Sequence, residues 1–179
     1  MPQNKRRIDL VSSPDFVADL ESASIDDLRR RRKVCSDLDV ELSYYRRLIH
    51  GRMDLLAFEM RRRRGEEQRS LLEALPEILA AGATNSPGFP ERQVEVVVPS
   101  IPERGRRAVD RALSDDFLMR LPDIGDEELE EIQTRLGEIE VEVSRQRRAV
   151  FDAYDRIQAE LTRRYRDGLL TVDDLLGRP

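Results

Sequence analysis

The sequence has very little cysteine and histidine, and each shortage removes a class of functional site. Cys35 is the only cysteine among 179 residues, so an intramolecular disulfide is impossible and a cysteine-based zinc site is implausible. There is one histidine, and no Gly-rich phosphate loop, metal-ligand cluster or strand–loop–helix unit that would hold a nucleophile is present. We therefore expect neither an enzyme nor a bound metal.

Aromatic residues and long apolar runs are also scarce. Aromatics make up 5% of the chain with no tryptophan, whereas 37% of residues are charged, so a large globular core is not expected. This balance favours long exposed helices packed along narrow seams. No apolar run approaches the length of a membrane span and no signal-peptide pattern occurs, so we expect a soluble, cytoplasmic protein without membrane contact.

Lysine is nearly absent. Only Lys5 and Lys33 are lysines among 31 basic residues. Arginine presents planar, bidentate donors to phosphates, carboxylates and guanine edges, although a GC-rich genome would produce the same bias. The net charge of −5 argues against a general nucleic-acid binder, so direct DNA binding is not expected.

Residues 24–64 are predicted to form one long helix. The stretch contains no proline and a single glycine, Gly51; Ser24 offers an N-cap, and Gly65 a left-handed C-terminal cap after a basic run. Apolar residues recur every seven positions, as in a coiled coil. The repeat consists of Leu28, Cys35, Leu42, Ile49 and Leu56, with Leu38 and Tyr45 between them.

Residues 126–167 are predicted to form a second long helix, acidic at its start and basic at its end, in agreement with the helix dipole. The same spacing occurs in Leu129, Leu136, Val143, Val150 and Ile157, with Ile132 and Ile139 between them. Neither helix would stay ordered alone with one apolar stripe. We predict an all-α fold, a long antiparallel coiled-coil hairpin with short accessory helices and a Pro/Gly-rich linker; pairing between two chains is the alternative.

The rest of the chain is predicted to be short helices and connections around this hairpin. We expect a flexible N-terminus over 1–23 with a short helix near 15–21, and one coiled-coil domain over 24–179. Within that domain the other predicted parts are a short helix 66–81 with a kink or break at Pro76, a linker 82–105 with an extended piece at 93–98, a short helix 106–121 that stops before Pro122, and a terminal turn or helix at 169–176.

The two long helices carry the same series of polar residues at the same spacing. The first series is Asp39, Ser43, Arg46, His50 and Asp54, and the second is Glu140, Ser144, Arg147, Phe151 and Asp155. At about 100° per residue, the shared offsets keep each series within roughly 80° of one helix face. Both series also keep the same phase with the apolar repeat, which favours a binding face over two unrelated solvated faces carrying weak intrahelical pairs.

The chemistry of these side chains suits a nucleotide. Arginine binds guanine O6 and N7 or a phosphate, serine donates to phosphate oxygens, and a carboxylate accepts from amino and imino groups of a base. An antiparallel hairpin with one such stripe on each arm has an approximate two-fold axis. A cyclic dinucleotide shares that symmetry and is the predicted ligand.

Both stretches resemble the repeated motif of RsiG-type anti-sigma factors of actinobacteria: Glu, three residues, Ser, two, Arg, three, Gln, three, Asp. The matching segments are DVELSYYRRLIHGRMD (39–54) and EVEVSRQRRAVFDAYD (140–155), and the similarity extends to LPEILA, RRYRDG and VDDLL. The resemblance implies a coiled-coil anti-sigma factor that binds cyclic di-GMP, as an intercalated pair, and a WhiG-type sigma factor, which it keeps from RNA polymerase.

By position, the resemblance implies that the ten residues of the two series bind cyclic di-GMP, with Arg46 and Arg147 as the central contacts. The sequence departs from the motif at three positions: Asp39 replaces Glu, and His50 and Phe151 replace the two Gln residues. Histidine can still hydrogen-bond and add charge toward phosphate, whereas phenylalanine can only stack or pack. A structural or adaptor coiled coil that binds a protein without nucleotide is the alternative function.

Overall fold

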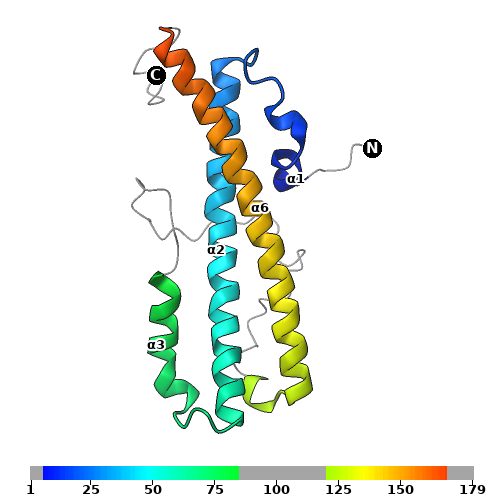
Figure 1. Cartoon of the computed structure of the whole chain (residues 1–179), viewed down its shortest axis with the longest axis vertical. Coiled ribbons are helices and arrows are strands. Elements are labelled where there is room, and N and C mark those ends of the chain that lie inside the picture. The colour runs from blue at the N-terminus through cyan, green and yellow to red at the C-terminus, as the bar shows by residue number, and fades with distance from the viewer. Residues whose placement is uncertain (1–5, 85–119, 169–179) are drawn as a thin grey trace. The chain divides into compact units, whose positions relative to one another are not determined.

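A computed structural model describes residues 6–84 and 120–168, and these residues are helical with no strand. The all-α class predicted from the sequence is therefore confirmed for this part of the chain. The elements in chain order are α1 (Arg7–Val11), the 3-10 helix η1 (Pro14–Val17), α2 (Ile25–Arg63), α3 (Leu71–Thr84), the 3-10 helix η2 (Leu121–Asp123) and α6 (Asp126–Arg166), drawn in Figure 1.

The chain divides into two compact units. The first unit comprises Met1–Leu42 and Arg145–Pro179, and the second comprises Ser43–Ser144. Both α2 and α6 contribute a segment to each unit. The division follows from the geometry of long helices, because each residue contacts only the partner segment at its own level and few contacts join distant levels.

The ends of α2 are set by local capping, as the sequence predicts. At its start the backbone N–H of Asp27 donates to the Ser24 hydroxyl at 3.2 Å. At its end Gly65 adopts a φ of 76°, and its N–H and that of Glu66 return to the carbonyls of Arg62 and Arg61 at 3.1 and 3.0 Å. These two hydrogen bonds form a Schellman motif, and it stops the helix where the basic run ends.

Helix α6 has charges that match its dipole at both ends. Its first turn holds Asp126, Glu127 and Glu128, and its last turn holds three arginines. Gly168 follows with a φ of 72°, and its N–H donates to the carbonyl of Tyr165 at 3.0 Å. The predicted second long helix is therefore confirmed, and it ends one residue earlier than expected.

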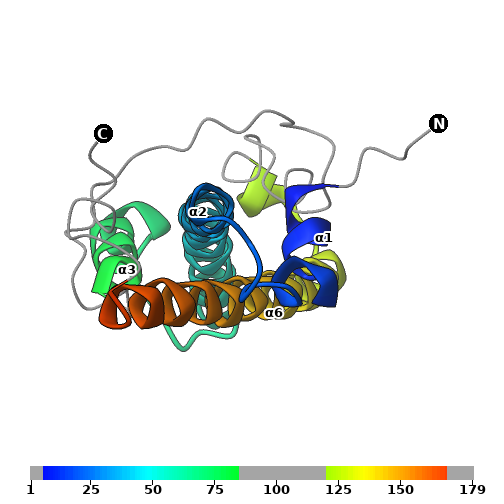
Figure 2. The same cartoon turned by 90° about the horizontal axis from the view of Figure 1, so that it is seen from above.

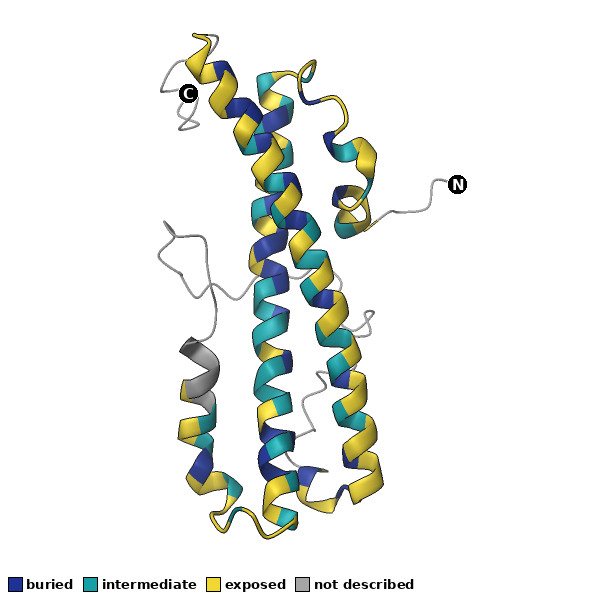
Figure 3. Cartoon of the chain, in the orientation of Figure 1, coloured by how far each residue is buried: buried dark blue, intermediate teal, exposed yellow. Residues whose placement is uncertain are grey.

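The seven-residue apolar repeats of α2 and α6 form the core. All ten repeat positions, from Leu28 to Leu56 and from Leu129 to Ile157, are at most 5% exposed, and the dark stripe in Figure 3 follows them. Within each unit the α2 segment lies next to the α6 segment, as can be followed in Figure 1 and Figure 2. Burial of these side chains, each worth roughly 1.5–3 kcal/mol, is the main source of stability.

The direction of the helices within each unit follows from their polar contacts. In the first unit Arg32 Nη1 donates to Gln158 Oε1 at 3.2 Å, while Arg147 pairs with Asp39. In the second unit Arg63 pairs with Asp126, and a second pair lies at Arg46 and Glu140. Ascending positions in α2 therefore meet descending positions in α6, so the helix segments of each unit run antiparallel.

The short 3-10 helix η1 overlaps the helix predicted near 15–21, whereas α1 lies in the stretch that was predicted to be a flexible N-terminus. Helix α1 occupies Arg7–Val11, η1 occupies Pro14–Val17, and the side chains of Val11, Val17 and Leu20 are buried. These three apolar residues lack helical spacing, so the sequence pattern gave no indication of the burial that holds the segment to its unit.

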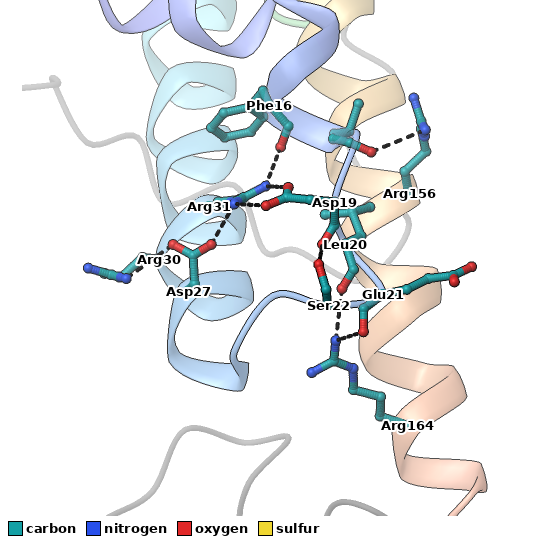
Figure 4. A network of polar contacts seen from close by, with 11 residues as sticks. Phe16, Asp19, Leu20, Glu21, Ser22, Asp27, Arg30, Arg31, Arg156 and Arg164 are labelled. Carbon is teal, nitrogen blue, oxygen red and sulfur yellow. Dashed lines mark hydrogen bonds and ion pairs between the residues drawn. The ribbon is translucent and has the colours of Figure 1, made fainter.

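Arginines of α2 and α6 hold this N-terminal segment by its backbone, as Figure 4 shows. Arg31 Nη1 donates to the carbonyl of Phe16 at 2.8 Å and to Asp19 Oδ1 at 2.7 Å. Arg164 Nη2 donates to the carbonyls of Leu20 and Glu21 at 2.8 and 3.1 Å. Long-range contacts to main-chain oxygens leave no motif in the sequence of the segment, so no pattern in the sequence predicts them.

Helix α3 begins later than predicted and is not broken by proline. The Glu67 carboxylate accepts the N–H groups of Gln68 and Arg69 at 3.0 Å each, which favours a turn over helix in 66–70. Ser70 and Glu73 then form a reciprocal capping box. Pro76, exposed in the second turn, removes one backbone hydrogen bond, and the capped helix continues through it to Thr84.

Several remaining predictions fall on parts outside the described residues. These are the linker from residue 85 onward with its extended piece at 93–98, the short helix 106–121 up to residue 119, and the terminal turn or helix at 169–176. The linker was expected to begin at 82, but 82–84 belong to α3. Residue 120 is helical, and Pro122 lies within η2, which follows directly.

The buried carboxylate of Glu59 anchors the end of α2. Its Oε1 accepts from Arg62 Nη2 at 2.7 Å and Arg63 Nε at 2.8 Å, and Arg63 also donates to Asp126. The hydrogen bond from Arg62 and that from Arg63 outweigh burial and lower the pKa of Glu59. A carboxyl whose folded pKa is depressed stabilises the fold above its unfolded pKa and loses that contribution as the pH falls through the folded value.

Glu59→Gln is expected to lower the free energy of unfolding by roughly 1–3 kcal/mol at pH 7, because a buried charge-assisted contact is weakened. The difference should shrink as the pH falls below about 4.3, the ordinary pKa of this carboxyl in the unfolded chain, and the contribution of the charge is lost once the pH has fallen through the lower pKa of the folded protein. Thermal unfolding followed by circular dichroism between pH 7 and 3 measures it. If the difference in the free energy of unfolding between the two proteins stays constant over that range, the lowered pKa of Glu59 is contradicted.

Candidate functional site

In the second unit, three side chains of the repeated series converge on one carboxylate oxygen. Glu140 Oε1 accepts from Ser144 Oγ at 2.7 Å and from Arg46 Nε at 3.1 Å, and His50 Nε2 lies 3.2 Å from the same oxygen. Arg46 and His50 come from the first series on α2, and Glu140 and Ser144 from the second series on α6. The cluster therefore joins the two copies of the motif.

The electrostatics of this cluster favour the charged carboxylate. Burial of the Glu140 side chain, which is 20% exposed, raises its pKa, but the hydrogen bonds from Ser144, Arg46 and His50 more than offset burial. The pKa of Glu140 is therefore held below its ordinary value, and the carboxylate is ionised at neutral pH. Arg46 and His50 stay partly exposed, so a ligand can reach the donors from solvent.

The first unit contains the corresponding ion pair, between the acid that opens the first series and the arginine of the second series. Arg147 Nε donates to Asp39 Oδ1 at 3.1 Å, and both side chains are only 12% exposed. The guanidinium carbon of Arg147 also lies 4.5 Å from the centroid of the Phe151 ring. A cation–π contact of this kind is worth roughly 0.5–2 kcal/mol. Phe151, which replaces the glutamine of the motif, thus stacks on the motif arginine.

The pairing is reciprocal. The acid that opens the first copy, Asp39, binds the arginine of the second, and the acid that opens the second copy, Glu140, binds the arginine of the first. Both contacts use the arginine Nε and both measure 3.1 Å. Two copies of one motif therefore make equivalent cross-helix contacts, one in each unit.

The other three residues of the series lie on the same two helices. Ser43 is half-buried on α2, and Asp54 and Asp155, which close the two copies, are exposed. An exposed carboxylate at the end of each copy can accept hydrogen bonds from a ligand at little desolvation cost. Of the ten predicted residues, seven make the contacts described above.

One buried acid next to the site has no counterpart in the predicted set. Glu41 is 1% exposed and accepts from Arg7 Nη2 at 2.8 Å, which ties α1 to α2. It directly precedes Leu42 of the apolar repeat, a position that flanks a coiled-coil seam and is commonly charged and exposed. The ion pair with Arg7 of α1 accompanies this burial, and no pattern in the sequence indicated α1.

A comparison against known families matches part of the chain. Residues 14–79 match the RsiG-like family. The matched segment includes η1, α2, most of α3 and the entire first copy of the motif, so the resemblance seen in the sequence is confirmed over this part. The second copy, from Glu140 to Asp155, lies beyond it. No curated protein matches the chain.

The RsiG-like family is a regulatory family of anti-sigma factors. Within the described residues, no helix has both the length and the apolar character needed to cross a membrane.

Proposed function

We propose that this RsiG-like chain is an anti-sigma factor that binds cyclic di-GMP through its two motif copies and sequesters a WhiG-type sigma factor from RNA polymerase. The proposal includes a coiled-coil packing of α2 against α6 that carries the motif copies. The nucleotide acts as a regulatory ligand that strengthens the association with the sigma factor, and the chain performs no catalysis.

One observation carries the proposal: the reciprocal pairs of Asp39 with Arg147 and of Glu140 with Arg46. A solvated helix face would use acid–arginine pairs within one helix, at three or four residues' separation. These pairs instead join two helices at corresponding motif positions and are mostly buried. Such equivalence is expected when both motif copies recognise the same guanosine phosphate chemistry.

The groups present in the second unit match the polar atoms of a guanosine phosphate. Arg46 uses only its Nε within the described residues, so its two Nη groups remain for guanine O6 and N7 or for a phosphate oxygen. Ser144 and His50 can donate to phosphate, and the carboxylate of Asp54 can accept from guanine N1–H and N2–H.

An adaptor that binds a protein without nucleotide is the second candidate. It is favoured by one observation, namely that each motif arginine already has a carboxylate partner from the other helix. Under that hypothesis the pairs only fix the register of α2 and α6, and Arg46 and Arg147 have no ligand to bind.

The test is to measure association of the full-length chain with a WhiG-type sigma factor by calorimetry, with and without cyclic di-GMP. The proposal expects nucleotide binding and a tighter protein complex when the nucleotide is present. Cyclic di-AMP is the matched control, because adenine has an amino donor where guanine has the O6 acceptor that arginine binds. Sigma binding with the same affinity under all three conditions would establish the adaptor instead.

A further inference from the structure

The convergence of three donors on Glu140 Oε1 is unusual for a simple helix–helix ion pair. A guanidinium, a hydroxyl and an imidazole from two helices meet one oxygen within 3.2 Å. A pair that only fixed helix register would need one donor. Three convergent donors around one anionic oxygen are instead typical of a site for an oxyanion, and a phosphodiester oxygen has the same charge and accepts the same hydrogen bonds.

We propose that Glu140 is an internal competitor, whose carboxylate occupies the position that a phosphate oxygen of the nucleotide takes when it binds Arg46, His50 and Ser144. This inference rests on the proposed function and adds a regulatory element to it. Binding transfers the three donors from Glu140 to the ligand. The carboxylate then swings toward solvent, to which its side chain is already 20% exposed.

The first unit does not provide the same exchange. Arg147 is held by Asp39 and also by the face of Phe151, and its side chain is less exposed than that of Arg46. Releasing Arg147 to a phosphate would forfeit the cation–π contact in addition to the ion pair. The phosphate-for-carboxylate exchange is therefore assigned to the second unit alone.

The test is the affinity for cyclic di-GMP of Glu140→Gln, measured by calorimetry on the full-length chain. Glutamine keeps the size of the side chain and removes the charge that competes with the phosphate. Because a partly exposed ion pair is worth up to about 1 kcal/mol, the variant should bind the nucleotide about two- to fivefold more tightly than the wild type.

Glu138→Gln is the matched control. Glu138 is exposed on the same helix segment, two residues away, so its substitution removes one negative charge from the chain without entering the cluster. If the loss of one negative charge anywhere on the chain is enough to favour the anionic nucleotide, both variants will bind it more tightly by the same factor. That result would overturn the inference. So would an unchanged or weaker affinity of Glu140→Gln, which would mean that the carboxylate binds the ligand itself.

A second readout does not depend on how the variant folds. The inference expects the pKa of Glu140, followed in the wild type by carbon NMR, to rise on saturation with cyclic di-GMP, because the carboxylate loses its donors to the phosphate. A pKa that stays low in the complex would overturn it. If the wild-type chain binds no cyclic di-GMP either alone or with the sigma factor, the proposed function is overturned, and the inference with it. Binding with the wrong response at Glu140 overturns only the inference.

Discussion

Arg46→Ala is expected to weaken the binding of cyclic di-GMP by about 10- to 100-fold. The Nε of Arg46 is engaged by Glu140, and its two Nη groups remain for the ligand. A bidentate contact between a guanidinium and guanine or phosphate is worth roughly 1–3 kcal/mol, which corresponds to that loss. Calorimetric titration of the full-length variant with the nucleotide, compared with the wild type, measures the change.

Arg135→Ala is the control for this prediction. Arg135 lies exposed on α6 in the same unit, so its removal changes the net charge by the same amount without touching the cluster. The control should bind the nucleotide within about a factor of two of the wild type, since isolated surface charges contribute little. Equal losses in the two variants would show that Arg46 acts only through the net charge of the chain.

The parts of the fold that the sequence predicted well are those set by local patterns. The apolar repeats of α2 and α6 appear at fixed spacing, and their burial follows from the helix period. The ends of both helices depend on Ser24, Gly65 and Gly168, whose capping behaviour is nearly independent of context. Such features need no knowledge of what packs against them.

The parts that the sequence could not predict depend on distant residues. The N-terminal segment is ordered by Arg31, Arg156 and Arg164, which donate to backbone carbonyls. Every residue has a backbone carbonyl, so no residue type in the segment marks this contact. Glu41 is a similar case, because its ion pair is with Arg7 of a helix that the pattern did not indicate.

The candidate site was predicted as a set of residues but not as a set of contacts. Equal spacing in the two copies placed each series on one helix face, and seven members do meet in the two clusters. The sequence did not indicate that each copy's acid would hold the other copy's arginine, because that pairing depends on the register of α2 against α6. It also gave no sign that Phe151 would stack on Arg147.

Leu136→Ala is expected to lower the free energy of unfolding by about 2–5 kcal/mol. Leu136 is a buried repeat position of α6 in the second unit, and truncating it removes transfer energy and leaves a cavity between the helices. Val141→Ala is the matched control on the same helix, since Val141 is 66% exposed, and it should cost less than about 0.5 kcal/mol. Urea unfolding followed by circular dichroism measures both.

The same variant links the stability of the second unit to its ligand. A ligand that binds only the folded state stabilises it by mass action. Cyclic di-GMP at 100 times its dissociation constant should therefore raise the free energy of unfolding of Leu136→Ala by about 2.7 kcal/mol. Combining Leu136→Ala with Arg46→Ala should reduce the restored free energy at the same nucleotide concentration. Equal recovery with and without Arg46 would place the nucleotide away from the Glu140 cluster, because loss of a contacting arginine must weaken the mass-action term.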